Sequence, residues 1–350
     1  MPVNPPPYNL LFASYLEPEH VEIIRRVDDR LAVFYEPDLV PPPRYASDHV
    51  GSPFRRTTEQ DARWRHLLSQ AHILFDFDRT YKQELPDLAP NLRWIQATSA
   101  GIGQFVKRRD YARRMPETIL TTASGVHAQP LAEFCLMAML AFSRGLLQMF
   151  DLQHQRRWER FAATDLAGRT LAVVGVGAIG REVARMGKAL GMRVLGIKRR
   201  VADVDPASLH LDALYPPEAL PTVLKQAEYL VLIAPHTPET EKMIGAEELA
   251  LLPGGAVVIN VGRGPLIDEP ALVEALRSGR LGGAALDVFA REPLPRESPL
   301  WTLPNVLVSP HSGSTSDREN SRLTALFCEN LRRFLAGQPM LNVFDTAWLY

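Results

Sequence analysis

The stretch that most constrains the fold runs from residue 173 to 200, beginning Val-Val-Gly-Val-Gly-Ala-Ile-Gly and ending Ile-Lys-Arg-Arg. An apolar run precedes the glycines, and apolar residues recur at helical spacing from Ile179 onward. This order predicts a buried parallel strand, a glycine turn, a helix and a second strand. We expect Gly175 to permit the tight turn, Gly177 to let the backbone approach a pyrophosphate, and Gly180 to pack closely on the strand. The free N–H groups at the helix N-terminus would face that anion.

A lone GxGxxG pattern also occurs in ordinary turns. Here the flanking strands and helix all agree, so the segment predicts a dinucleotide site. An acidic residue usually ends the second strand of a NAD-preferring site, whereas the 2′-phosphate of NADP requires positive charge there. This strand ends in Lys198, Arg199 and Arg200. They predict NADPH/NADP as the cofactor, with NADH/NAD still possible and an unpaired basic surface cluster as the alternative.

Length and charge limit the remaining possibilities. The 350 residues, 46% of them hydrophobic, suit a globular protein of about two domains. A net charge of −1 argues against a nucleic-acid-binding surface, so we predict no nucleic-acid partner. The N-terminus has neither the basic start nor the apolar segment of a secretory signal, and we therefore expect a cytoplasmic protein.

The most apolar helix expected from the sequence spans residues 131–150. Glu133 and Arg144 interrupt it, and the uninterrupted part is far shorter than the roughly 20 residues that cross a bilayer. We expect a buried or interface helix and no membrane partner. The cysteines, Cys135 and Cys328, lack metal-site or disulfide spacing, and no cluster of His, Cys, Asp and Glu has metal-ligand spacing. We therefore predict no metal.

Strands and helices alternate along the rest of the chain. The first domain is expected to end near residue 124, and only residues 40–58 break the alternation, where prolines predict a surface excursion. Beyond the glycine loop, strands are expected at residues 229–234, 256–261, 284–289 and 306–309. Helices are expected at residues 238–252, 269–278 and 317–335. Strands that alternate with helices predict an α/β fold with a doubly wound parallel sheet.

Three expected strands are followed by an ionisable residue. These residues are Arg263, Glu292 and His311. Ligands of open α/β sheets bind at the carboxyl ends of strands, so we expect the three to form one site. Arginine can bind a carboxylate through two hydrogen bonds, and histidine transfers protons near neutral pH when a carboxylate orients it. The set predicts reduction of a 2-oxo acid, although each residue alone also fits a solvated arginine, a surface acid or a core histidine.

Other polar residues near strand ends are more ambiguous. His127 and His236 are more often structural or rim histidines than proton donors. Asp287 lies inside an expected apolar strand, where a buried acid needs a hydrogen-bond donor such as a carboxamide or a backbone N–H. Pro235 suits packing against an adenine, and an ordinary loop proline is equally consistent with the sequence.

Five motifs, in order, resemble the D-isomer-specific 2-hydroxyacid dehydrogenases, the family that includes glyoxylate/hydroxypyruvate reductases. The resemblance covers residues 99–343, and Arg263 and Glu292 are separated as the family's catalytic arginine and glutamate are. The motifs are Gly-Val-Gly-Ala-Ile-Gly, Pro-His-Thr-Pro-Glu-Thr at 235–240, Asn-Val-Gly-Arg-Gly at 260–264, Asp-Val-Phe-Ala-Arg-Glu-Pro at 287–293 and Ser-Pro-His at 309–311.

The resemblance implies roles for individual residues. Arg263, Glu292 and His311 would be catalytic, and the backbone N–H groups of Ala100 and Gly101 would bind the substrate carboxylate together with Arg263. The implied cofactor contacts, beyond the glycines and the basic trio, are Ala178 and Ile179 at the pyrophosphate, Pro235 and Thr240 on the adenosine side, and Val261, Gly262, Asp287 and Gly313 at the nicotinamide.

The resemblance also implies an architecture. A Rossmann cofactor domain, residues 125–311, would be inserted in a smaller flavodoxin-like α/β substrate domain formed by residues 1–124 and 312–350. Members usually form homodimers through the cofactor domain, with the apolar helix at 131–150 as a candidate contact. Residues 40–58 match nothing in the family pattern.

The expected activity is reduction of a small 2-oxo acid to the D-2-hydroxy acid by NADPH. Glyoxylate, hydroxypyruvate and a phenylpyruvate-like acid are all candidate substrates. An alternative from another class is a dinucleotide-sensing, corepressor-like interaction protein with little turnover, since corepressors share this fold.

Overall fold

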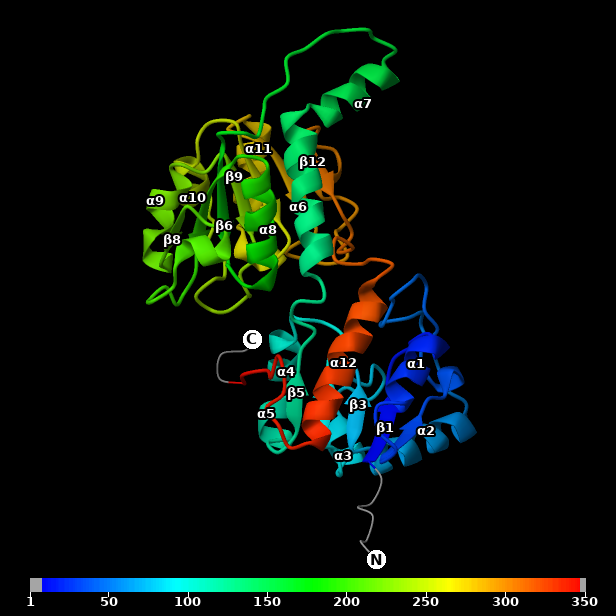
Figure 1. Ribbon diagram of the computed structural model, residues 1–350. Coiled ribbons are helices and arrows are strands. Elements are labelled where there is room, and N and C mark those ends of the chain that lie inside the picture. Colours follow the sequence, from blue (N-terminus) through cyan, green and yellow to red (C-terminus); the bar gives the residue numbers. More distant parts are fainter. Residues whose placement is uncertain (1–7, 347–350) are drawn as a thin grey trace, which may run out of the picture. The chain divides into compact units, whose positions relative to one another are not determined.

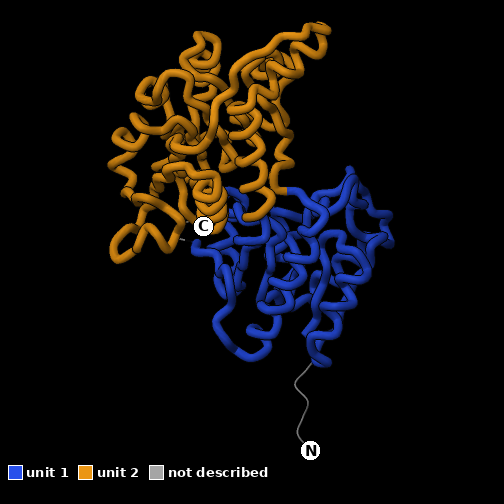
Figure 2. The backbone as a smooth tube through the Cα atoms, turned by 45° about the horizontal axis from the view of Figure 1, so that its top comes forward, with its two compact units in different colours: residues 1–127, 315–350 blue, residues 128–314 orange. Residues whose placement is uncertain are grey.

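The computed structural model describes residues 8–346, which form two compact units. Unit 2 is Ala128–Ser314, and unit 1 holds the residues up to His127 and from Thr315 onward (Figure 2). The domain boundaries expected from the sequence, after residues 124 and 311, each lie three residues before these positions.

Unit 2 is built on a seven-stranded sheet in which every neighbouring pair is parallel (Figure 1). The strand order is β12-β11-β10-β9-β6-β7-β8. The chain reverses its direction of winding between β6 and β9, as in a dinucleotide-binding fold. The strands are β6 (Thr170–Val174), β7 (Arg193–Ile197), β8 (Ala213–Tyr215), β9 (Tyr229–Leu232), β10 (Ala256–Asn260), β11 (Leu281–Leu286) and β12 (Val306–Val308).

Helices cover both faces of this sheet because alternate residues of each strand point to opposite faces. Leu171 and Val173 of β6 pack in one core with α6 and α8, while Ala172 and Val174 pack in the other with α9, α10 and α11. The helices are α6 (Ala128–Ser143), α7 (Leu146–His154), α8 (Ala178–Ala189), α9 (Leu220–Leu224), α10 (Ala246–Leu251) and α11 (Glu269–Arg277).

Unit 1 contains a five-stranded parallel sheet of order β2-β1-β3-β4-β5. Its strands are β1 (Tyr8–Phe12), β2 (Leu31–Phe34), β3 (Ile73–Phe75), β4 (Trp94–Gln96) and β5 (Ile119–Thr121). Its helices are α1 (Pro18–Arg25), α2 (Thr58–Gln70), α3 (Leu85–Leu88), α4 (Gly103–Arg108), α5 (Tyr111–Arg114) and α12 (Glu319–Leu335). The last helix, α12, packs beside α1 (Figure 1). Its Phe327 ring stacks on Trp94 of the sheet, with the ring centroids 4.9 Å apart. The α/β class with two parallel sheets is thus confirmed.

The single apolar helix expected at residues 131–150 was wrong. The chain forms α6 and α7, which meet at a 60° bend. Gly145 causes the break because it adopts a left-handed φ of 68°, and a Cβ there would lie 2.6 Å from the Phe161 ring. Among residues 8–346 no single helix is long and apolar enough to cross a membrane, and only the bent α6–α7 pair meets that test, on length and composition alone.

The helix expected at residues 238–252 was also wrong at its start, because only Ala246–Leu251 is helical. Residues 238–240 instead form a turn, and the N–H of Thr237 before it donates to Thr240 Oγ1 at 2.8 Å. The short edge strand β8 was not predicted.

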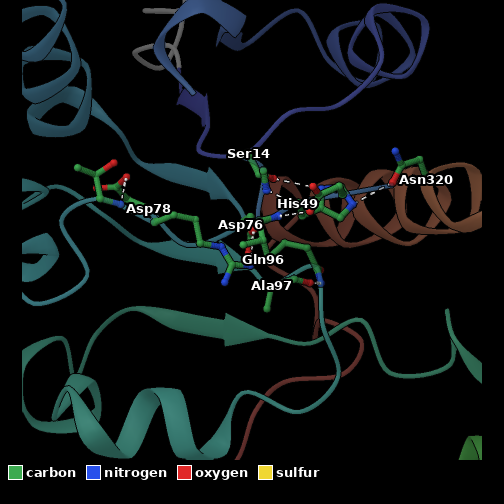
Figure 3. A network of polar contacts seen from close by, with 12 residues as sticks. Ser14, His49, Asp76, Asp78, Gln96, Ala97 and Asn320 are labelled. Carbon is green, nitrogen blue, oxygen red and sulfur yellow. Dashed lines mark hydrogen bonds and ion pairs between the residues drawn. The ribbon is translucent and has the colours of Figure 1, made fainter. Parts of the chain in front are cut away.

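Residues 40–57 form neither helix nor strand, as the sequence predicted, but buried polar contacts hold the segment to unit 1. His49 lies between Ser14, which follows β1, and Asn320 of α12 (Figure 3). Its ring nitrogens are 3.3 Å from Ser14 Oγ and 2.9 Å from Asn320 Oδ1. Asp48 closes the adjoining turn by accepting from the N–H groups of Val50 and Gly51. The excursion is therefore an anchored part of unit 1.

Candidate active site

Three neighbouring strands of unit 2 bring the predicted triad to one edge of the sheet. Arg263 follows β10, Glu292 follows β11 and His311 follows β12, and these strands are adjacent in the order β12-β11-β10. Since all are parallel, their carboxyl ends lie on the same edge, where α/β proteins bind ligands. Residues separated by 48 positions in the chain therefore meet in one group of loops.

His311 and Glu292 are in direct contact. His311 Nδ1 lies 2.8 Å from Glu292 Oε2, and the other carboxylate oxygen accepts the Phe289 N–H at 3.0 Å. The backbone bond fixes the carboxylate, which in turn orients the imidazole. Both side chains remain partly exposed, 46% for His311 and 36% for Glu292, so the pair is open to a ligand.

The charges of the triad act on one another. The hydrogen bond to Glu292 raises the pKa of His311 above its usual value, although burial opposes the shift. Burial acts to raise the pKa of Glu292, but the hydrogen bonds from His311 and Phe289 outweigh it, so that pKa is lowered. Burial lowers the pKa of Arg263, which the Glu292 carboxylate partly counteracts. The histidine is thus favoured in its protonated form beside an ionised glutamate.

Arg263 is presented by a tightly held loop. Its Nη1 donates to the Gly262 carbonyl at 2.6 Å. The side chain of Asn260 spans the same loop, accepting from the Gly262 N–H at 3.1 Å and donating to the Arg263 carbonyl at 3.0 Å. The sequence analysis gave Asn260 no role, although an asparagine two positions before Gly-Arg-Gly, at the end of an apolar run, was the available signal.

Asp287 lies just beyond β11 rather than inside a strand, because β11 ends at Leu286. Its Oδ1 accepts from Ser309 Oγ at 2.5 Å and from the N–H groups of Ser312 and Gly313, each at 2.8 Å. The expected donors are therefore mainly backbone N–H groups. They fix the loop that carries His311, which adopts a φ of 55°.

The glycine loop between β6 and α8 has the shape that a pyrophosphate requires. Gly175 has a φ of 106°, and a Cβ there would lie 2.6 Å from the Ala234 nitrogen. A Cβ on Gly180 would lie 2.4 Å from the Gly175 carbonyl oxygen, so this glycine permits close helix–turn contact. By contrast, a Cβ on Gly177 would have no atom within 4 Å. The space beside Gly177, at the start of α8 with Ala178 and Ile179, therefore fits an approaching anion.

The basic trio directly follows β7, which ends at Ile197. Lys198 is partly buried and its N–H donates to the Tyr215 carbonyl at 3.0 Å, whereas Arg199 and Arg200 are exposed. The nearby Glu239 has a lowered pKa, chiefly through a hydrogen bond with Thr237 and to a smaller extent through the charge of Arg199. The loop after β9 therefore lies beside the trio and contributes one acid.

The remaining predicted contacts lie in three loops. Thr240 Oγ1 donates to the Pro235 carbonyl at 2.7 Å, so this hydroxyl closes the loop after β9. Val261 and Gly262 are buried in the Arg263 loop. Ala100 and Gly101 lie in unit 1, between β4 and α4.

Each of the two ambiguous histidines lies near a glutamate outside the triad. His127 lies in unit 1, where it is buried with its Nε2 3.1 Å from Glu319 Oε1. His236 Nε2 lies 3.7 Å from Glu241 in the loop after β9. Within residues 8–346, no group of three or more His, Cys, Asp and Glu side chains is placed to hold a metal ion.

Comparison with known proteins identifies relatives over most of the chain. The sequence model described as "D-isomer specific 2-hydroxyacid dehydrogenase, NAD binding domain" matches residues 136–313. Glyoxylate/hydroxypyruvate reductase B of Yersinia pestis (strain Pestoides F) is 33% identical over 285 residues, 79% of this chain and 84% of that enzyme. D-3-phosphoglycerate dehydrogenase of Methanocaldococcus jannaschii is 34% identical over 65% of this chain, but the match spans only 43% of that enzyme.

Solved structures agree with these matches. The D-isomer specific 2-hydroxyacid dehydrogenase of Xanthobacter autotrophicus Py2, crystallised with NADPH and MES, superposes with a TM-score of 0.78 at 30% sequence identity. The superposition covers 98% of this chain and 100% of that one. The similarity therefore extends over both units.

Proposed function

The chain belongs to the D-isomer specific 2-hydroxyacid dehydrogenase family of oxidoreductases, and we propose that it reduces a small 2-oxo acid to the D-2-hydroxy acid with NADPH. The observation that carries this proposal is the contact between His311 and Glu292 at the edge of the sheet that also presents Arg263. The relatives named as glyoxylate/hydroxypyruvate reductases support glyoxylate and hydroxypyruvate as the first candidates.

The triad supplies binding and a proton. Arg263 binds the substrate carboxylate through its guanidinium and polarises the adjacent carbonyl. With Nδ1 on Glu292, the Nε2 of His311 is the ring nitrogen left to donate a proton to the carbonyl oxygen. A bound coenzyme would supply the hydride for the carbonyl carbon. Hydride and proton together convert the C=O group into CH–OH, and Glu292 stabilises the charged imidazole before transfer.

The backbone completes the substrate and coenzyme contacts in this proposal. Ala100 and Gly101 contribute N–H groups to the substrate carboxylate. The N–H groups of Ala178 and Ile179, at the start of α8, bind the pyrophosphate. Val261, Gly262, Asp287 and Gly313 would hold the nicotinamide.

The preference for NADPH rests on the three residues after β7. Lys198, Arg199 and Arg200 offer positive charge where an NAD-preferring site has a carboxylate. The structural relative from Xanthobacter autotrophicus was crystallised with NADPH, which supports this choice.

We also propose that the protein forms a homodimer, so that its partner is a second copy of this chain. Unit 2 exposes large apolar side chains along α6, α7 and the chain that follows them, namely Met137, Leu140, Met149, Phe150 and Trp158. Trp158 is 97% exposed, which is costly for an indole in water. Sedimentation of the wild type should show a dimer, and Trp158→Arg with Phe150→Arg should shift it toward a monomer.

Steady-state kinetics test the activity. Purified protein is assayed with glyoxylate, hydroxypyruvate and phenylpyruvate, each with NADPH and with NADH. We expect turnover with NADPH, and His311→Ala should lower kcat by about 100-fold or more while coenzyme binding persists. His66→Ala, an exposed histidine on α2, is the matched control. Tight coenzyme binding without turnover of any 2-oxo acid would contradict the proposal.

A further inference from the structure

Asn260, the last residue of β10, is almost completely buried, at 1% exposure. Both ends of its carboxamide are used within its own loop. Oδ1 accepts from the N–H two residues later, at Gly262, and Nδ2 donates to the carbonyl three residues later, at Arg263. The side chain therefore braces the turn from which the Arg263 side chain projects.

The turn needs such a brace because glycines lie on both sides of Arg263. Glycine leaves the backbone more conformational freedom than any other residue. The two glycines are required by close packing, since a Cβ on Gly262 would lie 2.9 Å from Leu266 Cδ1 and one on Gly264 would lie 1.9 Å from the Phe289 carbonyl carbon. The backbone conformation of the turn around Arg263 must therefore be restricted by another residue.

The backbone of Asn260 links the turn to the rest of the site. Its carbonyl accepts the Asp287 N–H at 3.0 Å, and Asp287 Oδ1 holds the loop of His311. Hydrogen bonds thus run without interruption from the Arg263 carbonyl through Asn260 and Asp287 to the N–H groups of Ser312 and Gly313. These hydrogen bonds therefore fix the position of the Arg263 loop relative to the His311 loop.

We propose that Asn260 is a positioning residue that holds the Arg263 guanidinium in the geometry required for carboxylate binding and carbonyl polarisation. This inference rests on the proposed function. Asparagine is suited to the task because its short side chain carries an acceptor and a donor at once. Aspartate would keep the bond to Gly262 but repel the Arg263 carbonyl, and serine is too short to bridge both groups.

A double-mutant cycle separates positioning from a general structural role. Four proteins are compared: the wild type, Asn260→Ser, Arg263→Ala and the double variant. Displacing a substrate-binding group by about 1 Å can cost on the order of 100-fold in rate, so Asn260→Ser should lower kcat/KM for the 2-oxo acid by roughly 10- to 100-fold. The loss should include a raised KM for the acid. In the Arg263→Ala background the same substitution should cost less than about threefold.

Three further measurements complete the test. Asn305→Ser, which removes the bond from Asn305 Nδ2 to the Leu276 carbonyl at 3.2 Å, is the matched control and should leave kcat/KM unchanged. The alkaline limb of the pH profile, set by His311 and Glu292, should not move in Asn260→Ser. The melting temperature shows whether Asn260→Ser folds. If Asn260→Ser does not fold, Asn260→Asp is used in its place.

The outcomes are distinguishable. An equal loss from Asn260→Ser in both backgrounds would overturn the positioning role, as would an unchanged kcat/KM in the single variant. If Arg263→Ala turns over the 2-oxo acid as fast as the wild type does, the role proposed for Arg263 itself is contradicted.

Discussion

His311 Nδ1 lies 2.8 Å from Glu292 Oε2, while the second oxygen of the same carboxylate accepts the Phe289 N–H. The carboxylate cannot rotate away from the imidazole without losing its own backbone partner. This relationship keeps an ionised acid against the ring and favours its protonated form, because the charged hydrogen bond with Glu292 raises the pKa of His311.

The pH dependence of reduction follows from this pair. In the proposed mechanism reduction requires protonated His311, so kcat/KM should fall as the pH rises through the raised pKa of that residue. Glu292→Gln removes the negative charge and therefore lowers this pKa, which moves the alkaline limb to lower pH. The exposed Glu297→Gln should leave the limb in place. A limb that stays fixed in Glu292→Gln would show that another group titrates.

Alanine substitutions at two glycines of the same motif should affect different properties, stability in one case and coenzyme binding in the other. Gly180→Ala places a Cβ 2.4 Å from the Gly175 carbonyl oxygen, and such overpacking should cost roughly 1–3 kcal/mol in the free energy of unfolding. Gly177→Ala places its Cβ in open space, so stability should change by less than about 1 kcal/mol while NADPH binding weakens. Denaturant unfolding and coenzyme titration measure the two effects. Normal NADPH affinity in Gly177→Ala would place the pyrophosphate elsewhere.

Coenzyme preference should depend on the residues after β7. Arg199→Ala with Arg200→Ala should remove the charged hydrogen bonds that we propose to the 2′-phosphate. Each is worth about 1.5–3 kcal/mol, so KM for NADPH should rise at least about tenfold. KM for NADH should change little. Arg277→Ala, an exposed arginine in the last turn of α11, is the control. Equal rises for both coenzymes would argue against 2′-phosphate recognition.

Asp287→Ala should damage stability and turnover together. The substitution leaves Ser309 Oγ and two backbone N–H groups without their acceptor, which should cost about 1–3 kcal/mol and release the loop of His311. Asp268→Ala, which removes the N-cap of α11, should cost about 1 kcal/mol with turnover unchanged. Unfolding curves and kcat measured in parallel test the contrast. Undiminished kcat in Asp287→Ala would mean that the loop keeps its conformation without the carboxylate.

Local patterns in the sequence predicted the main elements of unit 2 well. The strand, glycine turn and helix around Gly175 are encoded by adjacent residues, as are the apolar runs that became β9 to β12. The errors fall where distant packing overrides the local signal. The expected helix at residues 131–150 is broken at Gly145, where the Phe161 ring occupies the space that a Cβ would take. The expected start of a helix at residue 238 is lost because Thr240 bonds to its own loop.

By itself, the sequence determined the family, the α/β alternation and the identity of Arg263, Glu292 and His311 as candidates. Those features depend on residue type and spacing along the chain. Only the tertiary structure decided how the three side chains are held. Parallel pairing of β10, β11 and β12 brings their loops together, and buried Asn260 and Asp287 satisfy the N–H and carbonyl groups of those loops. Such pairing joins residues far apart in the chain, because every buried polar group needs a partner wherever the fold supplies one.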